Sequence, residues 1–255
     1  MKPQTLIDFF NERNQSLTKC FKRADADNLE ETLHKLRVDI KKIHFLLLFI
    51  GYFNHRKNIH DLYLPYRKIF KSIGVIRELQ LKQKLLIEYD PGKETIKEQN
   101  KLLKKEKKLA KNFLSHIHEY LKLIDATNKI ALTIFEKFPV FNEMEFLHSL
   151  SLLTKRQFSK INVEHLHESR KTLKTIIYSK QLFPHAAVFR KILNVKVADD
   201  LQDLIGAWHD KTVLADWMNQ NSKSSEYATI KVSIKNAAAA DFKLIKQASS
   251  NLFRS

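Results

Sequence analysis

Two short segments of the chain carry the same basic side chains at the same spacing. Each has a histidine, an arginine three residues later and a lysine four residues after that: His34, Arg37 and Lys41 in the first, His167, Arg170 and Lys174 in the second. Arginine offers a planar fork of N–H donors, lysine a compact charge, and histidine a donor whose charge rises below neutral pH. These residue types suit phosphate oxygens, so the segments predict contact with a phosphate-containing anion.

Steps of three and four residues place side chains on one stripe of an α-helix, which turns by about 100° per residue. His44 extends the first stripe, and Lys171 lies beside the second. Like charges at this spacing repel by roughly a few tenths of a kcal/mol per pair. We expect no acid to relieve this repulsion, because Asp39 points away from the first stripe. An anion lying along each stripe would relieve it; the alternative is a solvated helix face, with His34 and His167 as hydrogen-bonded packing residues.

The spacing repeats along the chain at a constant offset of 133 residues (170 − 37). A second pair of segments follows in the same order: residues 73–78 resemble residues 205–210 at an offset of 132 (206 − 74), and both contain a glycine. This repetition favours the anion site over the solvated face. It predicts an internal duplication with an N-terminal helical half, residues 1–125, and a C-terminal half, residues 126–255. Two basic helices facing each other across a pseudo-twofold would form a basic channel.

The composition agrees with an all-α protein that has an anionic partner. Only 4 glycines and 5 prolines occur in 255 residues, too few for the many turns of a sheet protein. The formal net charge of +17 favours a polyanion or an anionic surface. Cys20 is the single cysteine, so no intramolecular disulfide is expected, and the apolar run at residues 45–50 is too short to cross a bilayer. We therefore expect a cytoplasmic protein without membrane contact.

Apolar periodicity predicts a series of helices. Their expected ranges are 5–22, 29–50 ended by Gly51, 61–71 and 75–89 separated at Gly74, 102 to as far as 137, 143–158, 165–183, 188–205, 207–219 and 227–248. Asp90-Pro91-Gly92 predicts a turn. In the last range, Ile230, Val232 and Ile234 alternate as in a strand, but the alanines at 237–240 favour a helix. The Lys-rich stretch Lys101–Lys111 is interpreted first as a solvated helix face and second as an anion site.

The repeated segments resemble the motifs of the CHAD (conserved histidine α-helical domain) family. One motif, His-x-x-Arg-Val with paired basic residues, is matched by His34, Arg37, Val38, Lys41 and Lys42. The other, His-x-x-Arg-Lys-x-x-Lys with a closing tyrosine, is matched by His167, Arg170, Lys171, Lys174 and Tyr178. The family's glycine-containing steps resemble residues 73–78 and 201–210. The resemblance covers roughly residues 5–250. It departs at His44 and Ile177, where the family usually has arginine, and at Lys41 and Lys42, where lysine replaces arginine.

This resemblance implies one domain over residues 1–255, in its stand-alone form, with two helical-bundle halves around a basic pore. It implies non-catalytic binding of inorganic polyphosphate, without a cofactor, in the cytoplasm or at polyphosphate granules. The predicted polyphosphate-binding residues are His34, Arg37, Lys41, Lys42, His44, Lys71, Arg77, His167, Arg170, Lys171 and Lys174.

Two other functions stay open at this stage. A general polyanion or nucleic-acid binder would have the same charge, although no helix-turn-helix or RNA-binding pattern is present. A metal-dependent phosphoanhydride hydrolase would need clustered acids, and near the basic segments only Glu78 and Asp210 are candidates, which we expect to cap or bridge helices. His116/His118 and His165/His167 are two residues apart, on opposite sides of a helix, so neither pair predicts a metal site.

Overall fold

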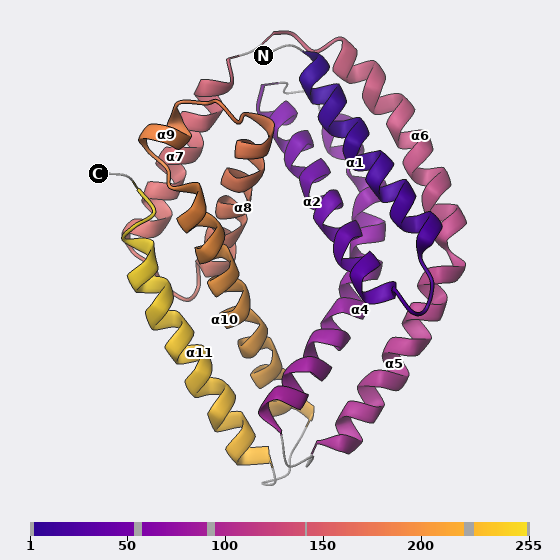
Figure 1. Cartoon of the computed structure of the whole chain (residues 1–255), viewed down its shortest axis with the longest axis vertical. Helices are drawn as coiled ribbons and strands as arrows, with labels where there is room; N and C mark the ends of the chain where they lie inside the picture. Colours follow the sequence, from indigo (N-terminus) through magenta and orange to yellow (C-terminus); the bar gives the residue numbers. More distant parts are fainter. Residues whose placement is uncertain (1–2, 54–57, 91–94, 141, 222–226, 254–255) are drawn as a thin grey trace. The chain divides into compact units, whose positions relative to one another are not determined.

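In a computed structural model, the described residues 3–53, 58–90, 95–140, 142–221 and 227–253 are almost entirely helical (Figure 1). Within these ranges, the only β pairing is an isolated antiparallel bridge between Leu193 and Phe253. The predicted all-α fold is confirmed. The helices are α1 (Pro3–Arg23), α2 (Leu29–Phe53), α3 (Asn58–Asp61), α4 (Leu64–Tyr89), α5 (Ile96–Ser115), α6 (Ile117–Glu136), α7 (Glu143–Ser159), α8 (Leu166–Leu182), α9 (Val188–Lys191), α10 (Val195–Asn221) and α11 (Ala228–Ser249).

The chain packs as two compact units. The first comprises Met1–Gln80 and Asn100–Asn142, and the second comprises Leu81–Gln99 and Glu143–Ser255. Two of the three boundaries between the units therefore fall inside α4 and inside α5, and the third lies at the start of α7. In the first unit α1 packs on α2 and α6; in the second, α10 packs on α8 and α11. The division into duplicated halves at residues 1–125 and 126–255 stays a prediction.

Aromatic side chains form much of the core of the first unit. The ring of Phe10 on α1 meets that of Phe135 on α6 edge to face, with 5.0 Å between their centroids. Tyr66 of α4 is fully buried, and its hydroxyl lies 2.8 Å from the Oδ1 atoms of both Asn14 and Asn128. Because a buried hydroxyl without a partner is costly, these amides fix α4 between α1 and α6.

The hydrophobic side chains that are completely buried in the described part of the second unit are aliphatic. Leu173 of α8, Ile205 and Leu214 of α10, and Ile234 of α11 are completely buried. A charged pair joins the two longest helices of this unit, since Nζ of Lys211 on α10 lies 2.6 Å from Oδ2 of Asp241 on α11. Across the described ranges, no helix is both long enough and apolar enough to cross a membrane.

Three glycines predicted to end or interrupt helices lie inside helices instead. α2 continues through Gly51 to Phe53, α4 through Gly74, and α10 through Gly206. Glycine costs a helix only about 1 kcal/mol relative to alanine, and packing can outweigh that cost. The expected breaks at these positions were therefore wrong, and Gly74 and Gly206 have another role, described below. The proline and glycine of the predicted turn at residues 90–92 lie outside the described residues.

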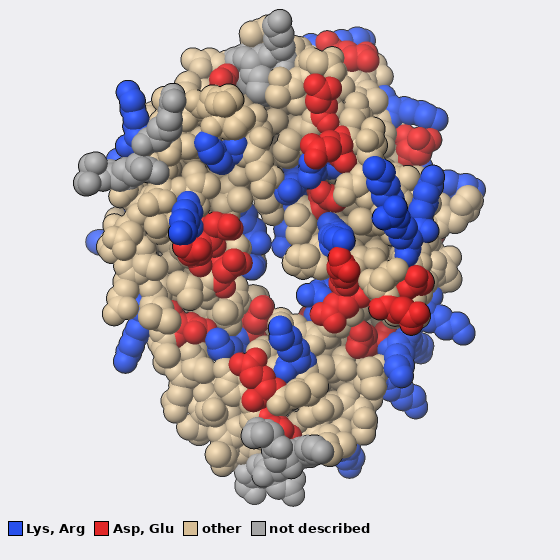
Figure 2. All heavy atoms as spheres, in the orientation of Figure 1, with Lys and Arg blue, Asp and Glu red and all other residues tan. Residues whose placement is uncertain are grey.

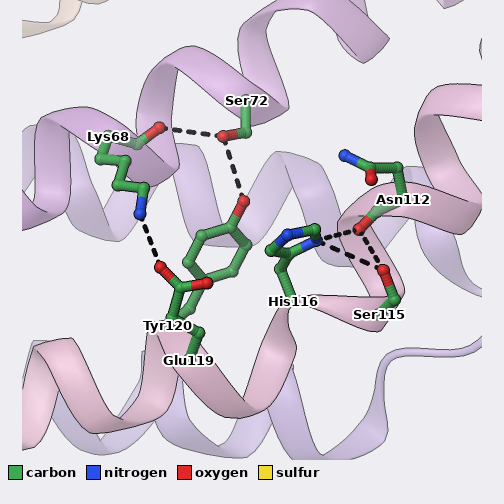
Figure 3. A network of polar contacts seen from close by, with 7 residues as sticks. All are labelled: Lys68, Ser72, Asn112, Ser115, His116, Glu119 and Tyr120. Atoms are coloured by element: carbon green, nitrogen blue, oxygen red, sulfur yellow. Dashed lines mark hydrogen bonds and ion pairs between the residues drawn. The ribbon is translucent and has the colours of Figure 1, made fainter.

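The single helix expected from residue 102 as far as 137 is in fact two helices, α5 and α6, with a break at His116 (Figure 3). Nδ1 of His116 lies 2.7 Å from the carbonyl oxygen of Asn112, and the Ser115 hydroxyl donates to the same oxygen at 2.8 Å. Side chains thus occupy a carbonyl that α5 would otherwise leave unsatisfied at its end. Beside the break, Lys68 of α4 binds Glu119 of α6 at 2.6 Å.

The helical prediction for the last segment is confirmed by α11. Ile230 and Ile234 are buried, whereas Val232 between them is 57% exposed. Burial therefore follows the four-residue step of a helix.

Candidate functional site

In the first unit, Arg37 of α2 reaches the backbone of α4. Its Nη1 donates to the carbonyl oxygen of Phe70 at 3.2 Å, and its Cζ lies 4.0 Å from the centroid of the Phe70 ring. The same nitrogen lies 3.0 Å from the point where a Cβ on Gly74 would be. A helical carbonyl accepts from the N–H four residues later and still has a second lone pair. The Arg37 guanidinium can thus bind the carbonyl of Phe70, which lies one turn before Gly74.

In the second unit, Arg170 of α8 makes the equivalent contact with α10. Its Nε donates to the carbonyl oxygen of Gln202 at 3.0 Å, and its Nη2 lies 2.6 Å from the Cβ that an alanine would have at Gly206. In both units, therefore, the carbonyl that accepts the bond lies four residues before the glycine. The two glycines matched in the sequence leave room for the two matched arginines.

The remaining predicted residues of α2 are distributed over more than one side of the helix. Nζ of Lys41 lies 5.8 Å from the centroid of the Phe70 ring, on the side of Arg37. His44 stacks on Tyr63, with 3.9 Å between ring centroids, and His34 is exposed. Burial lowers the pKa of Lys42, and Arg13 of α1 lowers it further. Lys42 is therefore turned toward α1, away from the Arg37 side, as the 100° step from Lys41 requires.

Two acids close to the predicted site residues of this unit, Asp39 and Glu30, lie beside basic partners. Asp39 is buried, with Oδ1 3.5 Å from Nη1 of Arg13, so it points away from the basic stripe as expected. Nη1 of Arg77 lies 3.0 Å from carboxylate oxygen Oε1 of Glu30 and 3.0 Å from Oε1 of Gln80. Arg77 is thus bound within a polar network that joins α2 and α4. Lys71 is exposed on α4.

On α8, two histidines come together. The ring of His167 lies 5.8 Å from that of His209 on α10, and His209 occupies the repeat position of Arg77. Burial lowers the pKa of His167, and the positive charges of Lys171 and His209 lower it further. Lys171 pairs with Glu168 at 2.7 Å. An acid does therefore lie beside the second basic stripe, contrary to the sequence expectation. Lys174 is half-buried one turn beyond Arg170.

Some of these contacts were not identified from the sequence. Phe70 and Tyr63 face Arg37 and His44, and His209 faces His167. The repeat contained a signal for His209, since it aligns with Arg77. Within the described ranges, no three or more His, Cys, Asp or Glu side chains gather where they could hold a metal ion.

The chain is all-α, and each of its two basic helices contacts a helix that has a glycine at the contact. These features identify the class of protein to which the chain belongs. The CHAD domain model matches residues 10–219, and the chain belongs to the CHAD family, a family associated with polyphosphate binding. The crystal structure of the CHAD domain from the plant Ricinus communis is similar to it, with a TM-score of 0.72 over 99% of this chain and 94% of that one. Sequence identity is 12%, so this likeness concerns the fold. Among curated proteins, no relative was found.

The packing at Gly206 leads to a stability prediction. Replacing an ordinary helical glycine by alanine stabilises a protein by about 0.5–1 kcal/mol. We expect this gain for Gly51→Ala, because nothing lies within 4 Å of its added Cβ. Gly206→Ala should show no gain, because the new methyl group displaces the Arg170 guanidinium and breaks its bond to Gln202. Urea unfolding of both variants measures the difference. An equal gain in the two variants would show that Arg170 moves without cost.

Proposed function

We propose that this protein binds inorganic polyphosphate and does not hydrolyse it. The observation that carries the proposal is the matched pair of anchored arginines, Arg37 and Arg170, each on a basic helix of a CHAD domain. A guanidinium whose position is fixed by a backbone carbonyl binds phosphate with less loss of side-chain entropy than a mobile one. Lys41 and Lys174, one helical turn further along, would add charge along the same line.

We further propose that the basic sides of α2 and α8 contact one polyphosphate chain, in a pore lined by two copies of a duplicated unit. The equivalent arginine–carbonyl–glycine contacts support the duplication, because they match in residue type and chain order. A repeating linear anion suits two similar sets of cations, since every phosphate along it presents the same oxygens and charge.

Binding without catalysis is supported by the partners of the nearby acids. Glu30 is bound to Arg77, Glu168 to Lys171, and Asp39 to Arg13. Carboxylates held by cations are poorly placed to take a divalent metal or to activate water. The pairing of these three acids thus favours electrostatic binding of phosphate over hydrolysis.

The first binding prediction tests both the identity of the ligand and the involvement of both basic helices, α2 and α8. Long-chain polyphosphate should bind at least about tenfold more tightly than duplex DNA of equal charge at physiological salt, and both should weaken as salt rises. Lys41→Gln and Lys174→Gln should each lower the polyphosphate affinity about tenfold, by removing a charge-assisted contact. The lysines are substituted rather than the arginines, because Arg37 and Arg170 also join helices and their loss would disturb the packing. Isothermal titration calorimetry measures all of these affinities.

Lys235→Gln on α11 is the matched control, since Lys235 is exposed and the change in net charge is the same. It should reduce the affinity by less than about twofold. Equal losses at all three positions would mean that net charge alone explains binding. A loss at only one of Lys41 and Lys174 would contradict the two-copy site.

A second prediction concerns catalysis. Incubation with polyphosphate or nucleoside triphosphates and magnesium, manganese or zinc should release no orthophosphate above the protein-free rate, as measured by a colorimetric phosphate assay. Release that disappears in the Lys41→Gln variant would show that the basic helices form an active site.

A third prediction follows from the lowered pKa of His167. A polyanion close to the imidazole stabilises its charged form and raises this pKa, so binding should take up protons at pH values between the lowered pKa of the free protein and the raised pKa of the complex. The polyphosphate affinity should then rise as the pH falls through this range. Titrations in buffers of different ionisation enthalpy measure the uptake, which should shrink in His167→Gln. Undiminished uptake in that variant would place the polyphosphate away from His167.

A further inference from the structure

A row of lysines runs along one side of α5. Its members follow one another at steps of three, four and three residues, and all are exposed: Lys101, Lys104, Lys108 and Lys111. These steps return to the same side of a helix at every turn. At a rise of about 1.5 Å per residue, the α5 lysine row is about 15 Å long. In Figure 2, blue side chains project along the edge of the molecule over α5.

The opposite side of α5 is buried. Leu102 and Phe113 are in the core of the first unit. Glu106, on the same side, accepts a hydrogen bond from Nε2 of Gln80 at 2.8 Å. Lys104, Lys108 and Lys111 therefore lie on the side of α5 away from Glu106. Like charges at these steps repel, and a polyanion along the row would relieve the repulsion.

The chemistry of the row favours one kind of ligand. A helix that enters a membrane surface places large apolar or aromatic residues beside its cations, and readers of single-stranded nucleic acid stack bases on aromatic rings. Phe113 is the single aromatic residue of α5 and it is buried, while Ile96 and Leu103, 45% and 39% exposed, are the exposed large apolar side chains of this helix. The α5 lysine row thus offers charges at regular intervals along a line and little else. A linear anion composed of phosphates alone matches it.

We propose that the α5 lysine row is a second contact for long polyphosphate chains, separate from the basic positions of α2 and α8. The proposal rests on the proposed function. A chain that reaches both surfaces binds the second intramolecularly and gains affinity that a short chain lacks. Long and short polyphosphates should therefore respond differently to changes in the row.

The experiment compares two triple variants that change the net charge equally. One is Lys104→Glu/Lys108→Glu/Lys111→Glu in the α5 lysine row, and the other is Lys196→Glu/Lys235→Glu/Lys243→Glu on α10 and α11, where all three lysines are exposed. Circular dichroism checks that both stay folded. Calorimetry then gives the affinity of each, and of the unchanged protein, for tripolyphosphate, long-chain polyphosphate and duplex DNA, at two salt concentrations.

The row variant should bind long-chain polyphosphate at least about tenfold more weakly than the unchanged protein, with a shallower salt dependence. Its tripolyphosphate affinity should stay within about twofold, and the α10/α11 control should lose much less for the long chain. Equal losses in the two variants, or a loss confined to DNA, would overturn the second contact while leaving the proposed function intact. If the unchanged protein bound neither polyphosphate, the proposed function itself would fail.

Discussion

The site depends on a guanidinium that binds the main chain of a neighbouring helix. Arg37 and Arg170 each donate to a carbonyl one turn before a glycine. The carbonyl oxygens inside a helix rarely accept a hydrogen bond from a neighbouring helix, because the side chains of their own helix shield them. A glycine has no side chain, so the carbonyl one turn before it is accessible. The cation is fixed in position without an acid, so the positive charge at the site is not cancelled by the contact that orders it.

This arrangement explains how a densely basic surface can coexist with ordered side chains. Ion pairs would order the cations equally well, and the protein uses them for Arg77 and Lys171 as well as at Lys211–Asp241. A carboxylate partner competes with phosphate for the same donors, however. Anchoring through a carbonyl and through aromatic faces, as Arg37 does on Phe70, retains the full charge for an anion.

Much of the fold could be predicted from the sequence, because apolar periodicity and scarce glycine and proline depend on local properties. Apolar periodicity predicted the helix α2, and the spacing of basic residues predicted that α8 repeats its pattern. The continuity of α4 and α10 through Gly74 and Gly206 was not predicted, since a glycine that ends a helix and one that admits a guanidinium look alike until the facing arginine is known. The break at His116 was missed for a similar reason: the apolar pattern continues through it, and only side-chain hydrogen bonds to Asn112 reveal it.

The positions of the predicted site residues on their helices followed from the sequence only in part, for the same physical reason. The histidine–arginine–lysine spacing follows from helix geometry, so Lys41 was placed correctly on the side of Arg37. Lys42 comes from motif matching, and the helix turns it toward Arg13. The partners of the basic residues, such as His209 beside His167, lie on another helix and required the tertiary structure.

The glycine–arginine contact also constrains how this protein can change over time. An alanine at Gly206 overlaps the space of the Arg170 guanidinium, whereas loss of the arginine first would vacate that space. The order in which two substitutions arise then decides whether the intermediate sequence is tolerated, which is a form of epistasis. At Gly74 the separation from Arg37 is 3.0 Å, so an alanine would require Arg37 to shift only slightly and the constraint is weaker. The glycine of the second unit is therefore expected to persist for as long as its arginine does.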